Sequence, residues 1–139
     1  MHATLRPQHT YQRQAQAYRE SDVLSASPAR LLIITFDGLL MAMTRFRVAL
    51  STKNDELSLT SVATARSALC ELLATLDHEA GGSLADRLSS IYVFVLSELD
   101  TISHRPDLQR LDRNINIIRE LRDAFAAAAT VAAAPTAAA

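Results

Sequence analysis

Four histidines and one cysteine are the side chains in this sequence that most often bind metal ions or act as nucleophiles. They are His2, His9, Cys70, His78 and His104. Metal sites in helical bundles typically use Glu-x-x-His pairs, and the sequence contains no such pair. Asp100 and His104 are spaced to share one helix face, but two ligands do not make a metal site. We therefore predict that the protein holds no metal ion.

The sequence also lacks the motifs of nucleotide-binding and nucleophilic enzymes. Its glycines are Gly38, Gly81 and Gly82, a set that excludes the P-loop and the dinucleotide-binding glycine fingerprint. No serine stands in a Gly-x-Ser-x-Gly turn, and a lone cysteine such as Cys70 is usually a small buried hydrophobic residue. We predict no cofactor and no catalytic residue, and an enzyme with an unrecognised site is the least favoured hypothesis.

The most informative residues are apolar ones in excess of what a helical core requires. On each expected helix, apolar residues recur at spacings of three and four, which is the pattern of a helix packed against a core. Further apolar residues fall beside these seams and are candidates for binding a partner: Ile33, Leu40, Leu73, Phe94, Ile117 and Leu121. Any one of them is more often part of a core, but together they predict grooves that accept an amphipathic helix or an extended segment.

The first expected helix, from Pro28 to about Ser51, carries two of these candidates. Ser27 can cap the free amides at its start, and Pro28 suits the first helical position because its missing N–H has no partner there anyway. Its seam consists of Leu32, Phe36, Leu39, Met43, Phe46 and Leu50. Gly38 weakens this helix by about 1 kcal/mol relative to alanine, and a glycine at such a position often permits close packing.

The second helix is expected to begin between residues 55 and 60, with a seam of Val62, Ala65, Leu69, Leu72 and Leu76. Gly81 and Gly82 supply the backbone freedom that ends this helix and reverses the chain. Ser83, followed three residues later by Asp86, resembles a capping box at the start of the third helix. The seam of that helix consists of Leu84, Leu88, Tyr92, Val95, Leu99 and Ile102.

The third helix is expected to end at Arg105, because Pro106 disfavours helical geometry in the residue before it. Asp107 can cap the fourth helix. The fourth seam consists of Leu108, Leu111, Ile115, Ile118 and Phe125. Short connections force neighbouring helices to run in opposite directions, so we predict an all-α, antiparallel up-and-down four-helix bundle. A helix-swapped dimer is the alternative pairing of the same helices.

Composition limits where the protein works and what it binds. The chain has 139 residues, enough for one domain to bury about two-thirds of its unfolded surface without metals or disulfides. Its formal net charge is −1 with both signs interspersed, which argues against nucleic acid and a polybasic membrane surface as partners. No run approaches the roughly 18 to 20 continuous apolar residues that cross a bilayer, and no signal peptide is recognisable. We expect a cytoplasmic protein without membrane insertion.

The chain divides into three parts by composition. Residues 1–17 are largely polar, and we expect them to form a flexible N-terminal arm. Residues 18–126 contain the four expected helices and form the bundle domain. Residues 127–139 are rich in alanine, which favours helix but buries little area, so we expect a disordered tail.

A set of short motifs keeps its order and spacing from about Tyr18 to Phe125. The motifs are Ser25-Ala26-Ser27-Pro28, Phe36-Asp37-Gly38, Leu76-Asp77-x-Glu79-x-Gly81-Gly82, Ala85-x-x-Leu88, Ile91-Tyr92, Asp107 and Leu121-Arg122-Asp123-Ala124-Phe125. In this combination the sequence resembles FliS, a family of cytoplasmic flagellar secretion chaperones. The resemblance implies a four-helix bundle whose N-terminal segment covers part of the binding surface, and it implies no catalysis.

The same resemblance implies a partner, the disordered C-terminal segment of newly made flagellin. Wrapping that segment would prevent premature polymerisation, and the family further implies delivery to the flagellar export gate. We expect the segment from Tyr18 to Leu24 to cover Ile33 and Leu40 until flagellin replaces it, which adds Tyr18 to the candidate residues. The protein is expected to be a monomer or weak dimer. The alternative is a regulatory bundle that dimerises through the same apolar surface and has no unfolded partner.

Overall fold

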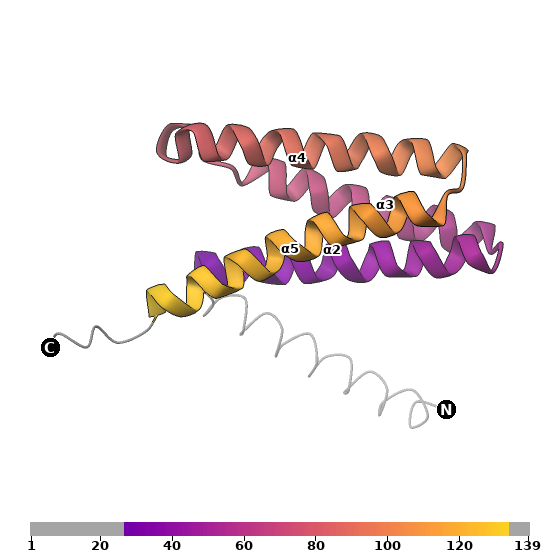
Figure 1. Cartoon of the computed structure of the whole chain (residues 1–139), viewed down its shortest axis with the longest axis horizontal. Helices are drawn as coiled ribbons and strands as arrows, with labels where there is room; N and C mark the ends of the chain where they lie inside the picture. The colour runs from indigo at the N-terminus through magenta and orange to yellow at the C-terminus, as the bar shows by residue number, and fades with distance from the viewer. Residues whose placement is uncertain (1–26, 134–139) are drawn as a thin grey trace, which may run out of the picture.

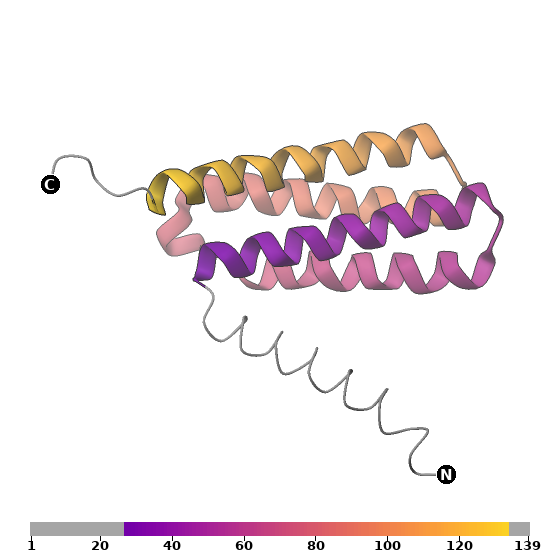
Figure 2. The ribbon, with the colours of Figure 1, turned by 90° about the horizontal axis from the view of Figure 1, so that it is seen from below.

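The computed structural model describes residues 27–133 as four helices and contains no strand in that range. The helices are α2 (Pro28–Ser51), α3 (Asp55–Ala74), α4 (His78–His104) and α5 (Leu108–Ala133). α2 and α4 each pack between α3 and α5, so the chain goes round the bundle in sequence order (Figures 1 and 2). The prediction of an all-α up-and-down bundle is confirmed. The expected covering segment lies outside the described residues.

A side chain caps the start of each of the four described helices. The Oγ of Ser27 accepts a hydrogen bond from the Arg30 amide at 3.2 Å, with Pro28 in the first turn of α2. Asp107 accepts one from the Arg110 amide at 3.0 Å, so the caps predicted at Ser27 and Asp107 are confirmed. α3 begins at Asp55, within the predicted interval, and Asn54 caps it by accepting from the Leu57 amide at 3.1 Å.

The turn between α3 and α4 differs from the prediction. α3 ends at Ala74, and the chain reverses before the two glycines rather than at them. α4 begins at His78, capped by Asp77, whose carboxylate accepts from the amides of residues 79 and 80. Gly82 interrupts α4 with a φ of 52°, a left-handed conformation that glycine adopts without steric cost. The glycines therefore kink a helix that has already started.

The last helix is longer than expected. α5 continues through Ala133, so it includes seven residues that composition alone places in the alanine-rich tail, counting from 127 to 133. Alanine has the highest helix propensity of any residue, and the Thr130 hydroxyl donates a hydrogen bond to the Ala126 carbonyl at 2.9 Å. Continuation of the helix past the bundle therefore needs no tertiary packing. Residues 134–139 lie outside the described residues.

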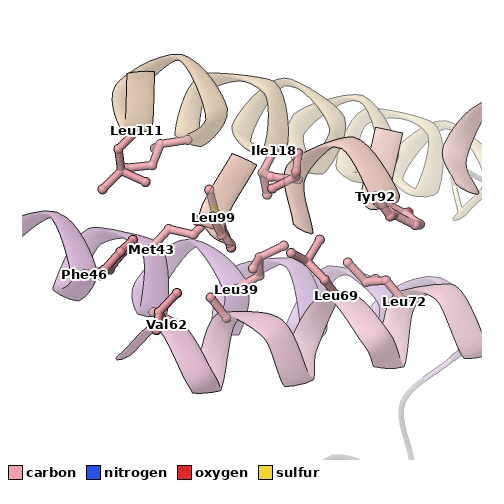
Figure 3. Close-up of a cluster of buried hydrophobic side chains, with 14 of the residues drawn as sticks. Leu39, Met43, Phe46, Val62, Leu69, Leu72, Tyr92, Leu99, Leu111 and Ile118 are labelled. Carbon is pink, nitrogen blue, oxygen red and sulfur yellow. The ribbon is translucent and has the colours of Figure 1, made fainter. Parts of the chain in front are cut away.

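All four helices contribute to one apolar core (Figure 3). Figure 3 shows side chains of α2 and α3 pointing toward those of α4 and α5. The predicted seams supply most of it, with these members fully enclosed: Phe36, Leu39, Met43, Phe46, Ala65, Leu69, Val95, Leu99, Ile102, Leu111 and Ile118. Leu84 is an exception to the predicted seams, because it is 57% exposed; Leu76 lies beyond the end of α3 but still packs against the core.

Gly38 does not make the close contact that its position in a helix suggests. No atom beyond its own helix and neighbours lies within 4 Å of where a Cβ would stand, and the residue is exposed. Gly81 is the glycine that needs its small size, since a Cβ there would lie 2.9 Å from the Cβ of Ala85. Close contact with Ala85, four residues on in the same kinked helix, therefore explains Gly81, and no such contact explains Gly38.

Gly38→Ala is expected to raise the free energy of unfolding by about 1 kcal/mol, because the added methyl enters open space and alanine favours helix. Urea unfolding followed by circular dichroism measures this change. Gly81→Ala is the matched control and should destabilise the protein, since its methyl meets Ala85. A Gly38→Ala variant that is less stable than the original would contradict the prediction.

Candidate functional site

An apolar cavity of about 320 Å³ lies at one end of the bundle. At this end α2 and α4 begin, α3 ends, and α5 leaves the bundle (Figure 1). Its lining comes from all four helices and the α3–α4 turn: Leu32, Leu72, Thr75, Leu76, Asp77, Ala80, Gly81, Leu84, Ala85, Leu88, Tyr92 and Phe125. The lining is mostly aliphatic and aromatic, so the cavity suits an apolar side chain.

The α3–α4 turn and the kink at Gly82 form one wall of this cavity. Asp77 holds the first turn of α4 by its cap, and the positive φ of Gly82 changes the direction of the helix directly after that turn. The ring Nδ1 of His78 lies 3.2 Å from a carboxylate oxygen of Asp86 across the kink. Asp86 thus contacts His78, whereas the sequence motif suggested that it caps the helix together with Ser83.

Three aromatic rings support the inner end of the cavity. The ring of Phe36 lies 5.6 Å from that of Phe125 in a stacked arrangement and 6.2 Å from that of Tyr92 in a tilted one. Such pairs add to the stabilisation from burial. Burial also raises the pKa of Tyr92 to about 12, so its phenol stays neutral. Phe125, which is partly exposed, connects this cluster to the surface.

The seam between α4 and α5 is closed at one end by charged and polar groups. The guanidinium of Arg110 donates to both carboxylate oxygens of Glu98, and the Asn114 amide donates to Glu98 at 3.2 Å. The hydrogen bonds from Arg110 hold the pKa of Glu98 below its ordinary value, and the hydrogen bond from Asn114 lowers this pKa to a smaller extent. The side-chain oxygen of Asn114 is buried and has no hydrogen-bond partner among the described residues. This network fixes the position of α4 against α5.

Beyond this network, apolar side chains border the same seam. Phe94 stands four residues before Glu98 on α4, and Ile117 and Leu121 stand three and seven residues after Asn114 on α5. Residues at these spacings share a helix face, so all three border the seam. Phe94 is 50% exposed, and α4 packs less closely against its neighbours than α2 does. Phe125, one turn after Leu121, lines the end cavity, so the seam leads toward it.

The seam between α2 and α5 is covered by ion pairs. Arg47 donates to Asp112 at 2.5 Å, and Arg122 donates to Asp37 at 2.8 Å. Ile33 and Leu40 fall on the same face of α2 as Asp37 and Arg47, at spacings of three, four and seven. Each is partly buried. The hydrogen bond from Arg47 lowers the pKa of Asp112, which keeps this carboxylate charged.

The seam between α3 and α4 is marked by an ion pair between Arg66 and Asp100 at 3.0 Å. Leu73 stands seven residues after Arg66, so it lies on the same face of α3, where it packs against the core. Cys70 is exposed, so the expectation of a buried cysteine is wrong. A period of 3.6 residues places Cys70 beside the core seam, but only the packing of α4 decides whether that flank is covered.

The family model for the flagellar protein FliS matches residues 11–132. This match covers most of the chain and all four described helices except the last residue of α5. The chain belongs to the FliS family. The motifs noted in the sequence thus mark a true relationship, and the family match extends beyond the interval from Tyr18 to Phe125 in which they occur.

Curated relatives agree with this assignment. The flagellar secretion chaperone FliS of Salmonella typhimurium is 30% identical over 112 residues, covering 80% of this chain and 83% of the relative. The FliS chaperone of Campylobacter jejuni is 28% identical, with 78% and 85% covered. That of Vibrio cholerae is 27% identical, with 79% and 84% covered. Membership therefore places the chain in a family whose curated relatives are flagellar secretion chaperones.

In this FliS-family bundle, the predicted binding residues do not form one patch. Phe94, Ile117 and Leu121 border the α4–α5 seam, Ile33 and Leu40 border the α2–α5 seam, and Leu73 borders the α3–α4 seam. Tyr18 lies outside the described residues. Leu40, Leu73, Ile117 and Leu121 pack against the core, whereas Phe94 is half-exposed. The α4–α5 seam is the one that combines three predicted residues, and its Phe94 is half-exposed.

The end cavity of the FliS-family bundle was missed from the sequence. Seven of its lining residues were assigned to helix seams: Leu32, Leu72, Leu76, Leu84, Leu88, Tyr92 and Phe125. The glycine pair was the available signal, since two adjacent glycines at a helix start indicate an unusual backbone path. This backbone path and the early end of α3 separate the apolar residues at this end of the four helices. The space between them is the cavity.

The described residues give no sign of a metal site or a membrane span. No three His, Cys, Asp or Glu side chains gather there into a group that could hold a metal ion. The ring Nδ1 of His104 lies 2.9 Å from the backbone oxygen of Asp100 and 4.0 Å from its carboxylate. None of the described helices is long and apolar enough to cross a bilayer.

Proposed function

We propose that this chain is a flagellar export chaperone that binds the disordered C-terminal segment of flagellin in the grooves between its helices. The observation that carries the proposal is the half-exposed Phe94 on α4, in a bundle of the FliS family whose α5 carries the partly buried Ile117 and Leu121. The printed names of the relatives, which are flagellar secretion chaperones, support the same role. No catalytic step is required for this role, since binding alone sequesters the partner.

The α4–α5 seam suits a segment that is apolar along one side. Phe94 supplies an exposed aromatic ring, Ile117 and Leu121 supply the floor, and the end cavity accepts a further apolar side chain. The Glu98–Arg110 pair closes the seam at its other end and sets how far a bound segment reaches. This arrangement matches the binding of an amphipathic helix in a groove.

Several grooves are needed because the partner is disordered before it binds. Burial of apolar surface contributes about 25 cal/mol of binding free energy for each Å². This contribution must offset the conformational entropy that the whole segment loses when it becomes ordered. The α4–α5 seam is therefore the central contact, and Ile33, Leu40 and Leu73 at the other seams extend it along a wrapped segment. In this proposal the bound segment is unable to polymerise until the chaperone delivers it from the cytoplasm to the export gate.

The segment from Tyr18 to Leu24 is proposed to cover part of this surface when flagellin is absent. Its attachment point supports the proposal, because Ser27 stands at the end of the bundle that contains the cavity, and Leu32 lines that cavity. Residues 18–24 lie outside the described residues, so the exchange of covers stays a prediction.

Titration of the purified full-length protein with flagellin tests the proposal. We expect a saturable complex with intact flagellin, and at least about 100-fold weaker binding to flagellin that lacks its C-terminal segment, as expected when the main buried contacts are removed. Isothermal calorimetry measures both affinities and the negative heat-capacity change that apolar burial produces. Equal affinity for the two forms would rule the proposal out. Failure to bind either form would favour a bundle without an unfolded partner.

A further inference from the structure

The phenol of Tyr92 lies in the floor of the end cavity without a hydrogen-bond partner. The residue is 1% exposed, and its hydroxyl makes no hydrogen bond with any residue between 27 and 133. In that range the side-chain oxygen of Asn114 is the only polar side-chain atom that is both fully enclosed and unpartnered. The Tyr92 oxygen is therefore not enclosed, and it faces the cavity. Figure 3 shows Tyr92 and Leu72, another lining residue, at the same end of the core cluster.

The other polar side chains of the cavity lining already have partners. The hydroxyl of Thr75 donates to the carbonyl of Leu72 at 3.0 Å, and the carboxylate of Asp77 accepts from two amides in the first turn of α4. Burial raises the pKa of Tyr92 to about 12, so the phenol keeps its proton near neutral pH and remains a donor. Within the described residues, the cavity thus offers one unpaired side-chain donor in a mostly apolar lining.

Packing of the bundle does not explain why this residue carries a hydroxyl. The ring of Tyr92 lies 6.2 Å from that of Phe36, and a phenylalanine ring would make the same contact. A buried hydroxyl without a partner costs free energy, because it has given up its hydrogen bonds to bulk water. In the unbound bundle the hydroxyl is therefore a cost. An acceptor that arrives with a bound partner would remove that cost.

The cavity has an exposed mouth that leads to this floor. Ala80 is exposed and Leu84 is 57% exposed at the kinked start of α4, whereas Leu72, Leu88 and Tyr92 are buried. Its volume of about 320 Å³ is that of a small ligand pocket, which accommodates one large apolar side chain with the backbone that carries it. The bound group that fits this cavity is apolar and has a hydrogen-bond acceptor beside it.

A backbone carbonyl is the acceptor that a protein segment always carries beside an apolar side chain. Carbonyls in the interior of a helix are already paired with amides four residues further on, whereas an extended stretch or the last turn of a helix has unpaired carbonyls. A residue in such a stretch can place its side chain against Leu72 and Leu88 while its carbonyl accepts from Tyr92. The end cavity therefore favours a residue whose carbonyl is not part of a helix interior.

We propose that Tyr92 is a specificity-determining residue, whose hydroxyl donates to a backbone carbonyl beside a large apolar residue that the flagellin segment inserts into the end cavity. This inference rests on the proposed function, which supplies the partner. The apolar lining selects a large apolar side chain, and the phenol selects a backbone that is not helical at that residue. The end cavity thus marks the point where the bound segment leaves helical geometry.

Tyr92→Phe tests the hydrogen bond, because it removes the hydroxyl and keeps the ring. We expect this variant to bind flagellin about three- to tenfold more weakly, the fold-change that corresponds to one neutral hydrogen bond. Its resistance to urea should stay equal or rise, since an unpartnered hydroxyl is removed, whereas a general loss of structure would lower it. Isothermal calorimetry measures the affinities. Equal affinity of Tyr92→Phe and the original chain would overturn the proposal.

The matched control is Thr75→Val, which removes the lining hydroxyl that is already bonded to Leu72. We expect this variant to bind flagellin as the original does, and an equal loss in both variants would overturn the specific role of Tyr92. An original chain that binds no flagellin would reject the proposed function and this inference with it. Binding by the original chain that Tyr92→Phe leaves unchanged would reject this inference alone.

Tyrosine absorption gives an independent test, because the chain has no tryptophan and its tyrosines are Tyr11, Tyr18 and Tyr92. In a full-length chain with Tyr11→Phe and Tyr18→Phe, the near-ultraviolet band comes from Tyr92. The probe is the flagellin C-terminal segment with any tyrosine or tryptophan replaced by phenylalanine. At saturation we expect the band to shift to longer wavelength, as it does when a phenol donates a hydrogen bond. An unchanged band would overturn the proposal.

Discussion

Phe94→Glu is expected to weaken binding of the flagellin C-terminal segment by about 100-fold, because aromatic anchors at the centre of an interface contribute most of its affinity. Phe94 is half-exposed, so the change costs the bundle little core packing. A bound apolar segment would have to desolvate the new carboxylate, which adds to the loss. Isothermal calorimetry with flagellin measures the affinity, and circular dichroism confirms that the variant folds.

The matched control for this prediction is Leu59→Glu. Leu59 is an apolar residue of α3 that is 71% exposed and lies outside the α4–α5 seam and the end cavity. Leu59→Glu introduces the same charge as Phe94→Glu, so a general electrostatic effect of the added carboxylate would appear in both variants. We expect the control to bind flagellin as the original does. If Phe94→Glu and the original chain bind flagellin with equal affinity, the α4–α5 seam is not part of the binding surface.

Phe36→Ala is expected to lower the free energy of unfolding by about 3–5 kcal/mol, the usual cost of replacing a buried phenylalanine by alanine. Phe36 is fully enclosed and contacts the rings of both Tyr92 and Phe125, so its loss opens a void beside the end cavity. Domains of this size typically have about 5–15 kcal/mol of stability, so the variant is near the limit of folding. Urea unfolding at several temperatures measures the change.

Two variants keep this prediction testable if Phe36→Ala fails to fold. Phe36→Leu retains most of the volume and should cost less than the alanine change while still removing the aromatic contacts. Phe94→Ala serves as the exposed control and should change stability by less than about 1.5 kcal/mol, because half of its side chain is already in water. Equal costs at the two positions would mean that the aromatic cluster does not support the bundle end.

Helix positions and core seams were predictable from the sequence because both depend on local patterns. Ser27 and Asp107 cap helices as their types and positions indicate, and the spacing of Phe36, Leu39 and Met43 places them in the core. Capping needs only a few neighbouring residues, and a period of 3.6 determines which side of a helix is apolar. Family membership was recognisable for a similar reason, since it rests on motifs read along the chain.

The path of the chain between α3 and α4 was not predictable from the same patterns. A glycine pair is compatible with either a reversal or a kink; here Gly82 kinks α4, and Ala85 of the same helix lies close to Gly81. The early reversal moves Leu76 out of its helix and leaves Leu84 at the cavity. The cavity therefore follows from the meeting of four helix ends, which no single segment encodes.

By itself, the sequence determined the four helices between residues 27 and 133, most of the residues that form their core seams, and the family. The tertiary structure decided which residues on the flanks of those seams are covered, because the spacing between helices varies around the bundle. Phe94 and Cys70 are both flank residues that remain exposed, whereas Leu40 and Leu73 are flank residues that pack against the core. The spacing of apolar residues predicts on which side of its helix a side chain lies. Whether that side chain is buried or exposed to water depends on how closely the neighbouring helix packs.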